Sequence, residues 1–330
     1  MERLSRILRR WPLMWTEAVR AFLCMLPMMV ASGMGKPMYL VALGQGGFFF
    51  SSLFLPKKTG DRLVMGSLVL GLGLGFYLLG GTVVTNPWVA VIFTFMVCLN
   101  LSFLSGWKIG GPLALTLVMI YTAGLNTGSP EKASQNFLVF AFVLSWSALV
   151  SLLPFWKPVE PPPVNPDNGP GELAEQGVRM GIGTSLALGL SYMFGFAKLG
   201  WAPSAVGNVV RYERKLSRMR AWGRFWGTIG GALLATVALA LTSSVTIVVW
   251  MGAIFAVLNG LFKRTKLGMI PLFYTATILL LYTANDLSQG RIVTIQRVFY
   301  NLVGITIGMI VVVYPFPILM KKLWPGSPVE

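Results

Sequence analysis

Long apolar runs, separated by short polar segments, make up most of this chain of 330 residues. A helix rises about 1.5 Å per residue and the hydrocarbon core of a bilayer is about 30 Å thick, so a crossing helix needs about 20 apolar residues. Twelve runs can be distinguished, and most approach that length. They cover residues 18–34, 38–55, 63–82, 87–105, 110–125, 137–155, 178–196, 199–211, 222–242, 244–262, 267–284 and 298–319. The pattern predicts an all-α integral membrane protein with about twelve transmembrane helices.

A polar segment rich in proline and acidic residues divides the chain near its middle, at residues 157–176. Such a composition cannot bury a core and is typical of a stiff, solvated tether. The expected parts are a basic cytoplasmic segment at 1–16, a six-helix membrane repeat at 17–156, the cytoplasmic linker at 157–176, a second six-helix membrane repeat at 177–320 and a cytoplasmic tail at 321–330.

The two sides of this linker repeat each other at an offset of 159 to 161 residues. The matched positions are Glu17-Ala18-Val19-Arg20 with Gln176-Gly177-Val178-Arg179, Leu99-Asn100 with Leu258-Asn259, Pro112 with Pro271, and Tyr121-Thr122-Ala123 with Tyr282-Thr283-Ala284. Six spans in each half give both halves the same orientation, which is a parallel repeat. In transporters built this way, the substrate site usually lies near the membrane midplane where the repeats meet.

The distribution of Lys and Arg between the two sides of the membrane agrees with the twelve predicted spans. With the N-terminus in the cytoplasm, all of the 27 Lys and Arg lie on the cytoplasmic side except Lys36, Lys132, Lys198, Arg291 and Arg297. Cytoplasmic loops carry such an excess of Lys and Arg, so both termini are expected to be cytoplasmic. The net charge of +16 is therefore explained by membrane orientation, and we expect no nucleic-acid partner.

Composition narrows the range of functions. Apolar residues make up 55% of the chain and charged residues 12%, whereas an ordinary soluble chain is about 25% charged. The chain contains no His and no acidic cluster beside a span, which disfavours a membrane enzyme such as a prenyl or lipid transferase. Cys24 and Cys98 lie within apolar runs and are expected to serve packing. We expect no metal, no cofactor and no ATP-binding loop of its own.

One stretch, Arg211 to Leu234, combines the most concentrated positive charge with a small-residue helix. Its basic residues are Arg211, Arg214, Lys215, Arg218, Arg220 and Arg224. Gly227-Thr228-Ile229-Gly230-Gly231 follows, and small residues at this spacing let another helix approach closely. The charges fix orientation at the cytoplasmic face, or they attract an anionic substrate; the sequence leaves both interpretations open.

Three motifs in order resemble the fusaric acid resistance and aromatic acid exporter superfamily. Arg224-Phe225-Trp226-Gly227-Thr228-Ile229-Gly230-Gly231 is similar to its R-x-x-G-T-x-x-G signature. Gly200-Trp201-Ala202-Pro203-Ser204 is similar to its G-Y-W-A-x-(S/T) element. Residues 297–305 resemble its late R-x-x-D-T-x-x-G element, with Tyr300-Asn301 in place of Asp-Thr. The resemblance covers residues 177–320.

The resemblance implies an efflux protein of the bacterial inner membrane that exports small organic anions, such as aromatic carboxylic acids or related toxic compounds, driven by a gradient. It also implies a periplasmic membrane fusion (adaptor) protein as partner, and a homo-oligomer is a further expectation. Many family members carry large cytoplasmic domains after each membrane half. This chain has only the short linker and a stub from Lys321 to Glu330, so it resembles a short form of the family. The family motifs and the basic segment before them add a cationic gate or motif, made of Arg220, Arg224, Gly227, Thr228 and Arg297.

The second and eighth runs are candidates for broken helices. The second contains Gly44-Gln45-Gly46-Gly47, and the eighth is short and contains Pro203. Gly- or Pro-interrupted spans in matching places mark the site in repeat-built transporters, although glycine also serves close helix packing. Amides, hydroxyls and aromatic rings in the spans are candidates for binding a carboxylate and an aromatic body. The candidate substrate-binding residues are Gln45, Asn100, Tyr121, Trp201, Ser204, Asn208, Asn259 and Tyr282.

No acidic residue falls in the middle of a predicted span. A proton-coupled carrier usually keeps such a residue, so only Asp286 and Glu17, at span ends, are candidates for coupling. Arg20, Arg179 and Arg297 are expected near span ends, where arginine usually reaches the headgroups. Two alternatives stay open: a passive anion channel resembling the plant malate channels, which fits the missing acid, and an unrelated six-plus-six carrier of the major facilitator type.

Overall fold

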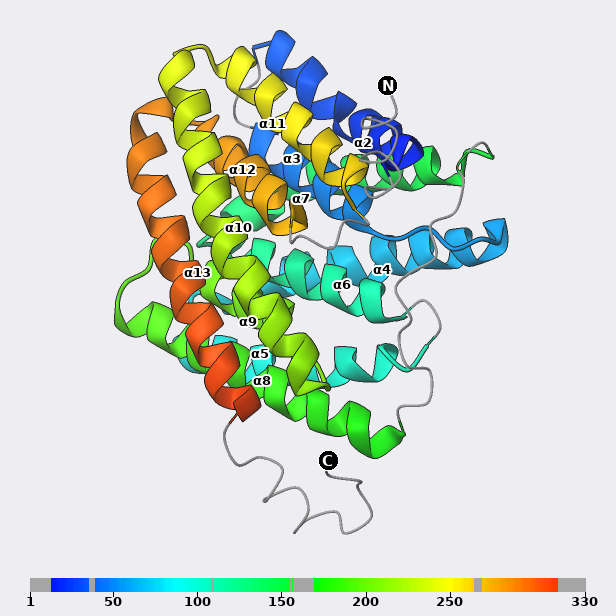
Figure 1. Ribbon diagram of the computed structural model, residues 1–330, viewed down its shortest axis with the longest axis vertical. Coiled ribbons are helices and arrows are strands. Elements are labelled where there is room, and N and C mark those ends of the chain that lie inside the picture. The colour runs from blue at the N-terminus through cyan, green and yellow to red at the C-terminus, as the bar shows by residue number, and fades with distance from the viewer. Residues whose placement is uncertain are drawn as a thin grey trace, which may run out of the picture. The chain divides into compact units, whose positions relative to one another are not determined.

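The structure is a computed structural model that describes residues 13–35, 39–107, 110–154, 156, 169–263 and 269–313. Within these residues the chain forms twelve α-helices, α2 to α13, and the short 3₁₀ helix η2 at Leu287–Gln289 (Figure 1). The described part contains no β-strand. The basic segment at 1–12, most of the linker and the C-terminal tail lie outside the described residues.

Each predicted apolar run coincides with one helix. In the first half these are α2 (Trp15–Gly33), α3 (Leu40–Ser52), α4 (Thr59–Val83), α5 (Pro87–Leu104), α6 (Gly110–Leu125) and α7 (Pro130–Leu152). In the second half they are α8 (Pro170–Met193), α9 (Trp201–Val209), α10 (Arg214–Leu241), α11 (Val245–Leu261), α12 (Met269–Thr283) and α13 (Gly290–Val313). The described part of the chain is therefore all-helical, as predicted.

Length and composition separate two kinds of helix. Among the described residues, α4, α5, α7, α10 and the segment Leu287–Val312 are long and apolar enough to cross a membrane. Shorter apolar helices are Leu40–Ser52, Gly110–Leu125, Val245–Leu261 and Pro271–Thr283. The described helices therefore include five clear spans, and the prediction of about twelve crossings stays a prediction. An apolar run can extend beyond its helix: Leu53, after α3, has extended backbone angles.

Several helices begin earlier than their apolar runs. α8 begins at Pro170, inside the predicted linker, because Gly169 is extended and proline suits the first helical turn. α10 begins at Arg214 and α13 at Gly290, so both include polar residues ahead of the apolar run. Arg297 therefore lies well inside α13.

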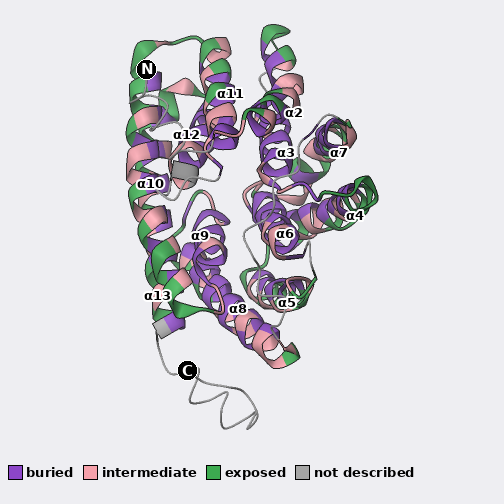
Figure 2. Cartoon of the chain, turned by 45° about the vertical axis from the view of Figure 1, so that its right-hand side comes forward, coloured by how far each residue is buried: buried purple, intermediate pink, exposed green. Residues whose placement is uncertain are grey.

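The short helices α3 and α6 are buried along most of their length, whereas the long helices expose one apolar side (Figure 2). Trp88 of α5, Leu138 of α7 and Trp226 of α10 are among the exposed large apolar side chains. A soluble protein rarely leaves such extended apolar faces in water, and hydrocarbon is the environment that matches them.

The chain forms two compact units, and each draws on both sequence halves. The first unit comprises Met1–Gly66, Leu138–Val159 and Gly223–Phe299; the second comprises Ser67–Phe137, Glu160–Trp222 and Tyr300–Glu330. In the first unit, α2 packs against α3 and α11, and α12 packs against α11 and α3. In the second unit, α8 packs against α5 and α9, and α6 packs against α5 and α9. The compact units therefore do not coincide with the two halves on either side of the linker.

The glycines of α3 serve close packing. The helix runs without interruption from Leu40 to Ser52, so the expectation of a break at Gly44–Gly47 was wrong for the described structure. A side chain on Gly47 would collide with the backbone oxygen of Cys24 on α2. α9 is also unbroken from Trp201 to Val209. The physical reason is that proline is tolerated in a first turn and glycine is tolerated where another backbone comes close.

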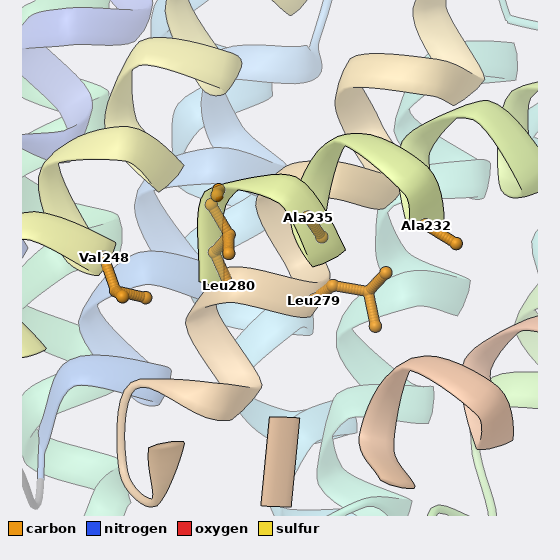
Figure 3. Packing of buried hydrophobic residues seen from close by; sticks show 6 residues of the cluster. Ala232, Ala235, Val248, Leu279 and Leu280 are labelled. Carbon is orange, nitrogen blue, oxygen red and sulfur yellow. The ribbon is translucent and has the colours of Figure 1, made fainter. Parts of the chain in front are cut away.

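In the first unit, α10, α11 and α12 share an apolar core. It consists of Ala232, Ala235 and Ala238 of α10, Val248 of α11, and Leu279 and Leu280 of α12 (Figure 3). The alanines leave room for the larger leucines, so the three helices pack closely. This packing fixes α10 relative to α12, and both helices carry residues of the candidate site.

Candidate functional site

The small-residue surface of α10 lies directly against α12. A side chain on Gly227 would collide with Pro271, and one on Gly231 would collide with the backbone oxygen of Leu272 and the side chain of Thr275. Only glycine allows the two backbones to come this close. The prediction that this motif lets another helix approach backbone to backbone is confirmed.

This close contact places Arg224 of α10 over a tyrosine of α12. The central carbon of the Arg224 guanidinium lies 5.2 Å from the centre of the Tyr274 ring, and the two side chains hydrogen-bond. Arg224 is only 4% exposed. A buried guanidinium on an aromatic face is a cation–π contact, which is strongest where water is excluded.

A second arginine reaches the same tyrosine from α13. Arg297 is 2% exposed and also hydrogen-bonds to Tyr274. It lies close enough to Arg224 for the two positive charges to repel each other. The expectation that Arg297 reaches the headgroups from a span end was therefore wrong: α13 begins earlier than its apolar run, and the side chain is directed into the protein.

Helix α3 completes the arrangement. The ring of Phe48 lies 5.1 Å from that of Tyr274, and the amide nitrogen of Gln45 donates a hydrogen bond of 2.6 Å to the hydroxyl of Tyr282. Tyr282 in turn interacts electrostatically with Arg297. We call Gln45, Arg224, Tyr274, Tyr282 and Arg297 the arginine–tyrosine cluster; it joins α3, α10, α12 and α13 within the first unit.

The cluster concentrates positive charge in a buried place. By sequence, Arg214–Leu241, Met269–Thr283 and Gly290–Val313 contain no Asp or Glu. A guanidinium offers a planar fork of donors that matches a carboxylate, and such charge-assisted hydrogen bonds are stronger where water is excluded. The arrangement can therefore bind a small anion.

Two buried hydroxyls lie on the same helices. Thr228 follows Arg224 by four residues, so both lie on one face of α10, and Thr275 is adjacent to Tyr274 on α12. Both side chains are at most 1% exposed, and their oxygens have no hydrogen-bond partner among the described residues. Buried hydroxyls normally find a partner, so these two are available as donors to a bound group.

Other predicted residues belong to the second unit and bond within it. Tyr121 pairs with Thr94 through their hydroxyls at 2.9 Å. Asn100 is exposed and donates to the oxygen of Met96 on its own helix. Arg220 also belongs to this unit and is half-buried. These contacts satisfy the side chains without a ligand.

The short helix α9 shows the same behaviour. Ser204 donates to the oxygen of Trp201 at 2.8 Å, and Asn208 donates to the oxygen of Ser204 at 2.7 Å. The ring of Trp201 lies 6.1 Å from that of Tyr300.

Asn259, on α11 of the first unit, is buried, and its side-chain oxygen has no partner among the described residues. The structure thus brings together Gln45, Tyr282, Arg224 and Arg297, whereas the predicted residues of α5, α6 and α9 lie in the other unit.

The two coupling candidates differ in their surroundings. Glu17 is buried, and one of its oxygens lies 2.6 Å from Arg20 and 2.9 Å from Lys263. Burial lowers the pKa of the Lys263 ammonium, just past the end of α11, to about 8, and the Glu17 carboxylate acts in the opposite sense. Asp286 is exposed and caps η2 by accepting hydrogen bonds from Ser288.

Arg20 and Arg179 are also buried, at 0% and 3% exposure. The expectation that these arginines reach the headgroups was wrong, because each has acceptors inside the protein. Arg20 donates to the oxygens of Ser51 and Leu53, and Arg179 pairs with Glu175.

Sequence reasoning missed Tyr274 and Lys263. A signal for Tyr274 was present: it precedes Tyr282 by eight residues, which is about two helical turns, so the two phenols share one side of α12. For Lys263 there was no such signal, because a lysine after a span is expected to face the cytoplasm.

Comparison with known proteins agrees with the motifs. Residues 186–311 match the family model described as fusaric acid resistance protein-like. No curated protein and no solved structure matched the chain. The matched segment holds Arg224, Tyr274, Tyr282 and Arg297. With its long apolar helices this is a multi-pass membrane protein, and its segment 186–311 is similar to the fusaric acid resistance protein-like family.

Proposed function

We propose that this protein exports small organic anions, such as aromatic carboxylic acids or related toxic compounds, and that the arginine–tyrosine cluster binds them. The observation that carries the proposal is the convergence of Arg224 and Arg297, both buried, on the single phenol of Tyr274. The family match supports transport, and the substrate class is the finer inference from these side chains.

Electrostatics supports an anionic substrate. Two like charges in a buried place repel each other, and each loses the solvation that it has in water. A bound carboxylate offsets both costs, because its two oxygens accept from both guanidinium groups. The hydroxyls of Thr228 and Thr275, buried on the same helices, add neutral donors.

The aromatic part of the substrate is argued from the rings. Phe48 and Tyr274 lie 5.1 Å apart at an angle of 49°. Aromatic rings prefer offset or tilted contacts with one another, so an aromatic carboxylate gains ring contacts that an aliphatic one lacks. We therefore expect aromatic acids to be preferred over aliphatic acids of similar size.

The proposal also includes the orientation of the chain in the membrane and its two parallel repeats. Twelve spans, both termini in the cytoplasm of a bacterial inner membrane, and two parallel repeats agree with the distribution of Lys and Arg. The repeat gains support from Arg20 and Arg179, which donate to the backbone oxygens of Leu53 and Tyr212, each 33 residues further along the chain. A periplasmic adaptor protein and a homo-oligomer are further parts of the proposal.

A passive anion channel is the second candidate. Glu17 is held by two cations and Asp286 is an exposed cap, so neither nominated acid has the surroundings of a group that binds and releases protons during a transport cycle. A channel needs no such group. The two functions differ in whether an uncoupler changes the flux.

The test measures efflux of preloaded aromatic and aliphatic carboxylates from cells that produce the wild type, Arg224→Ala or Arg218→Ala. Arg218 is the matched control because it lies on the same helix and is exposed. We expect Arg224→Ala to lower efflux of aromatic acids at least about tenfold, since a lost charge-assisted hydrogen bond costs about 1.5–3 kcal/mol. Efflux from Arg218→Ala is expected to equal that of the wild type.

An uncoupler distinguishes the exporter from the channel. An uncoupler that stops efflux supports a gradient-driven exporter; flux that only follows the concentration gradient supports the channel. Equal efflux from Arg224→Ala and the wild type, with equal amounts of protein in the membrane, would contradict the site.

A further inference from the structure

We infer that the two halves of this chain are obligate partners of each other: neither half covers all of the close-packed faces of its own helices, and α2 and α5 of the first half bind α11 and α8 of the second. The inference concerns assembly and does not depend on the proposed transport activity. It predicts that the halves stay associated when the peptide chain between them is cut.

In the first unit, α2 of the first half is bound by α11 of the second. The backbone nitrogen of Met14 donates to the oxygen of Leu261 at 2.9 Å. Lys263 reaches Glu17 at 2.9 Å and the oxygen of Leu53 at 2.6 Å. A side chain on Gly260 would collide with the backbone of Glu17, so the helices touch along their backbones.

In the second unit, α8 and α5 form the equivalent pair. Here the first helix of the pair, α8, comes from the second half, and its partner α5 comes from the first half. Ser102 donates to the oxygen of Leu173, and Ser185 donates to the oxygen of Val91, both at 2.9 Å. Tyr192 donates to the oxygen of Val84 at 2.6 Å. A side chain on Gly177 would collide with the side chain of Ser102, so α8 needs a glycine where it meets α5.

The pairs α2–α11 and α8–α5 occupy equivalent positions in the two units. Each unit takes the first and second helices of one half, α2 and α3 or α8 and α9, and the fourth and fifth helices of the other half, α11 and α12 or α5 and α6. Apart from the division between Val159 and Glu160, the unit boundaries fall within α4, α7, α10 and α13, the third and sixth helices of each half. A half without its counterpart would therefore leave the close-packed sides of two helix pairs uncovered. In a membrane, small residues and hydrogen-bonding side chains at such sides drive helices together.

The arrangement also divides the arginine–tyrosine cluster. Gln45 and Phe48 come from the first half, whereas Arg224, Tyr274, Tyr282 and Arg297 come from the second. The family-matched segment, 186–311, therefore holds the arginines but lacks the amide that bonds Tyr282.

The experiment uses the full chain with a protease site inserted into the linker and an affinity tag at the C-terminus. The protein is purified in mild detergent and cut completely, and the N-terminal fragment that stays with the tag is quantified after gel filtration. We expect the fragments to stay together. Release of the N-terminal fragment from the wild-type protein would overturn the inference.

Two glycine variants test the contact itself. Gly260→Leu places a side chain against the backbone of Glu17, whereas Gly71→Leu, on α4, meets no atom within 4 Å. Overpacking costs about 1–3 kcal/mol, so Gly260→Leu is expected to reduce the retained fragment about tenfold, and Gly71→Leu is expected to leave it unchanged. Equal retention in both variants would speak against this interface.

A cross-link excludes simple trapping of both fragments in one detergent micelle. Cys24 and Cys98 are replaced by alanine, and Ser102→Cys is combined with Gly177→Cys. Oxidation of the cut protein is expected to restore a full-length band on a non-reducing gel, and each single variant is expected to give two bands. Two bands from the double variant would show that α5 and α8 do not pair, and would overturn the inference even if the fragments elute together.

Discussion

Arg20 and Arg179 make the same contact in the two units of this protein. Each donates from its guanidinium to a backbone oxygen 33 residues further along the chain, Arg20 to Leu53 at 2.6 Å and Arg179 to Tyr212 at 3.5 Å. Each also pairs with a glutamate on its own helix. The accepted oxygens follow the ends of the short helices α3 and α9, where backbone oxygens lack helical partners and a cation is favourable.

These buried arginines lead to the first prediction. Replacing Arg20 by Met leaves Glu17 and several backbone oxygens in a buried place with fewer donors. Breaking a buried ion pair costs about 3–5 kcal/mol. The unfolding entropy is about 2.1 cal/mol/K per residue, so 1 kcal/mol lowers Tm by about 1.4 °C in a chain of 330 residues. We therefore expect Arg20→Met to lower the melting temperature in detergent by about 4–7 °C.

Arg179→Met is the matched comparison, because among the described residues Arg179 has fewer partners than Arg20. A smaller loss of melting temperature is expected for this variant. Equal melting temperatures for the wild type and Arg20→Met would show that the cluster around Glu17 contributes nothing to stability.

The second prediction separates the two tyrosines that the repeat pairs. Tyr282→Phe removes the hydroxyl that accepts from Gln45, inside the arginine–tyrosine cluster. Tyr121→Phe removes the equivalent hydroxyl, which bonds Thr94 in the second unit. A lost hydrogen bond of this kind is worth about 0.5–1.5 kcal/mol, so Tyr282→Phe should raise the KM for efflux several-fold, and Tyr121→Phe should affect stability only. Matching KM values for the two variants would contradict the placement of the site.

The third prediction concerns the contact between α10 and α12. Gly227→Leu forces a side chain into Pro271 and moves the helix that carries Arg224. Efflux should be lost, because a guanidinium displaced by about 1 Å no longer holds the substrate in place. Gly75→Leu, at a position with no atom within 4 Å, is the control. Membrane amount is measured for both variants by a C-terminal tag, and normal efflux from Gly227→Leu would refute the prediction.

The fourth prediction tests the orientation. Thr85 and Ser288 are exposed at helix ends that the charge pattern places outside the cytoplasm, whereas Lys58 is exposed at an end that it places inside. Single cysteines at Thr85 and Ser288 should react with an impermeant thiol reagent on intact spheroplasts. A cysteine at Lys58 should react only after lysis. The reverse labelling pattern would overturn the proposed topology.

The fold class could be predicted because the bilayer restricts it so strongly. Apolar runs of the right length form helices, since no water is present to satisfy an open backbone, and each of the twelve runs coincides with a helix. Helix starts could not be predicted, because α8, α10 and α13 begin in polar residues that the apolar pattern does not count.

The candidate site was predicted in part. Arg224, Arg297, Gln45 and Tyr282 were nominated, the first two from the motif and the other two from the pattern of polar residues in the spans. Tyr121, Asn100 and the polar residues of α9 were also nominated, because the sequence of a repeat does not show which of two matched residues binds a substrate. Contacts distinguish the copies: Tyr282 interacts with Arg297, whereas Tyr121 pairs with a threonine.

By itself the sequence determined that this is an all-helical membrane protein, because burial in hydrocarbon depends on the local run of side chains. It also indicated the resemblance of residues 186–311 to the fusaric acid resistance protein-like family, since each of the three motifs is a short local pattern. Only the tertiary structure decided that α2 packs with α11 and α5 with α8, and that Arg224 and Arg297 meet at Tyr274. The physical reason is that helices of the two halves present similar apolar and small-residue faces, so their pairing depends on contacts between distant segments that no local pattern contains.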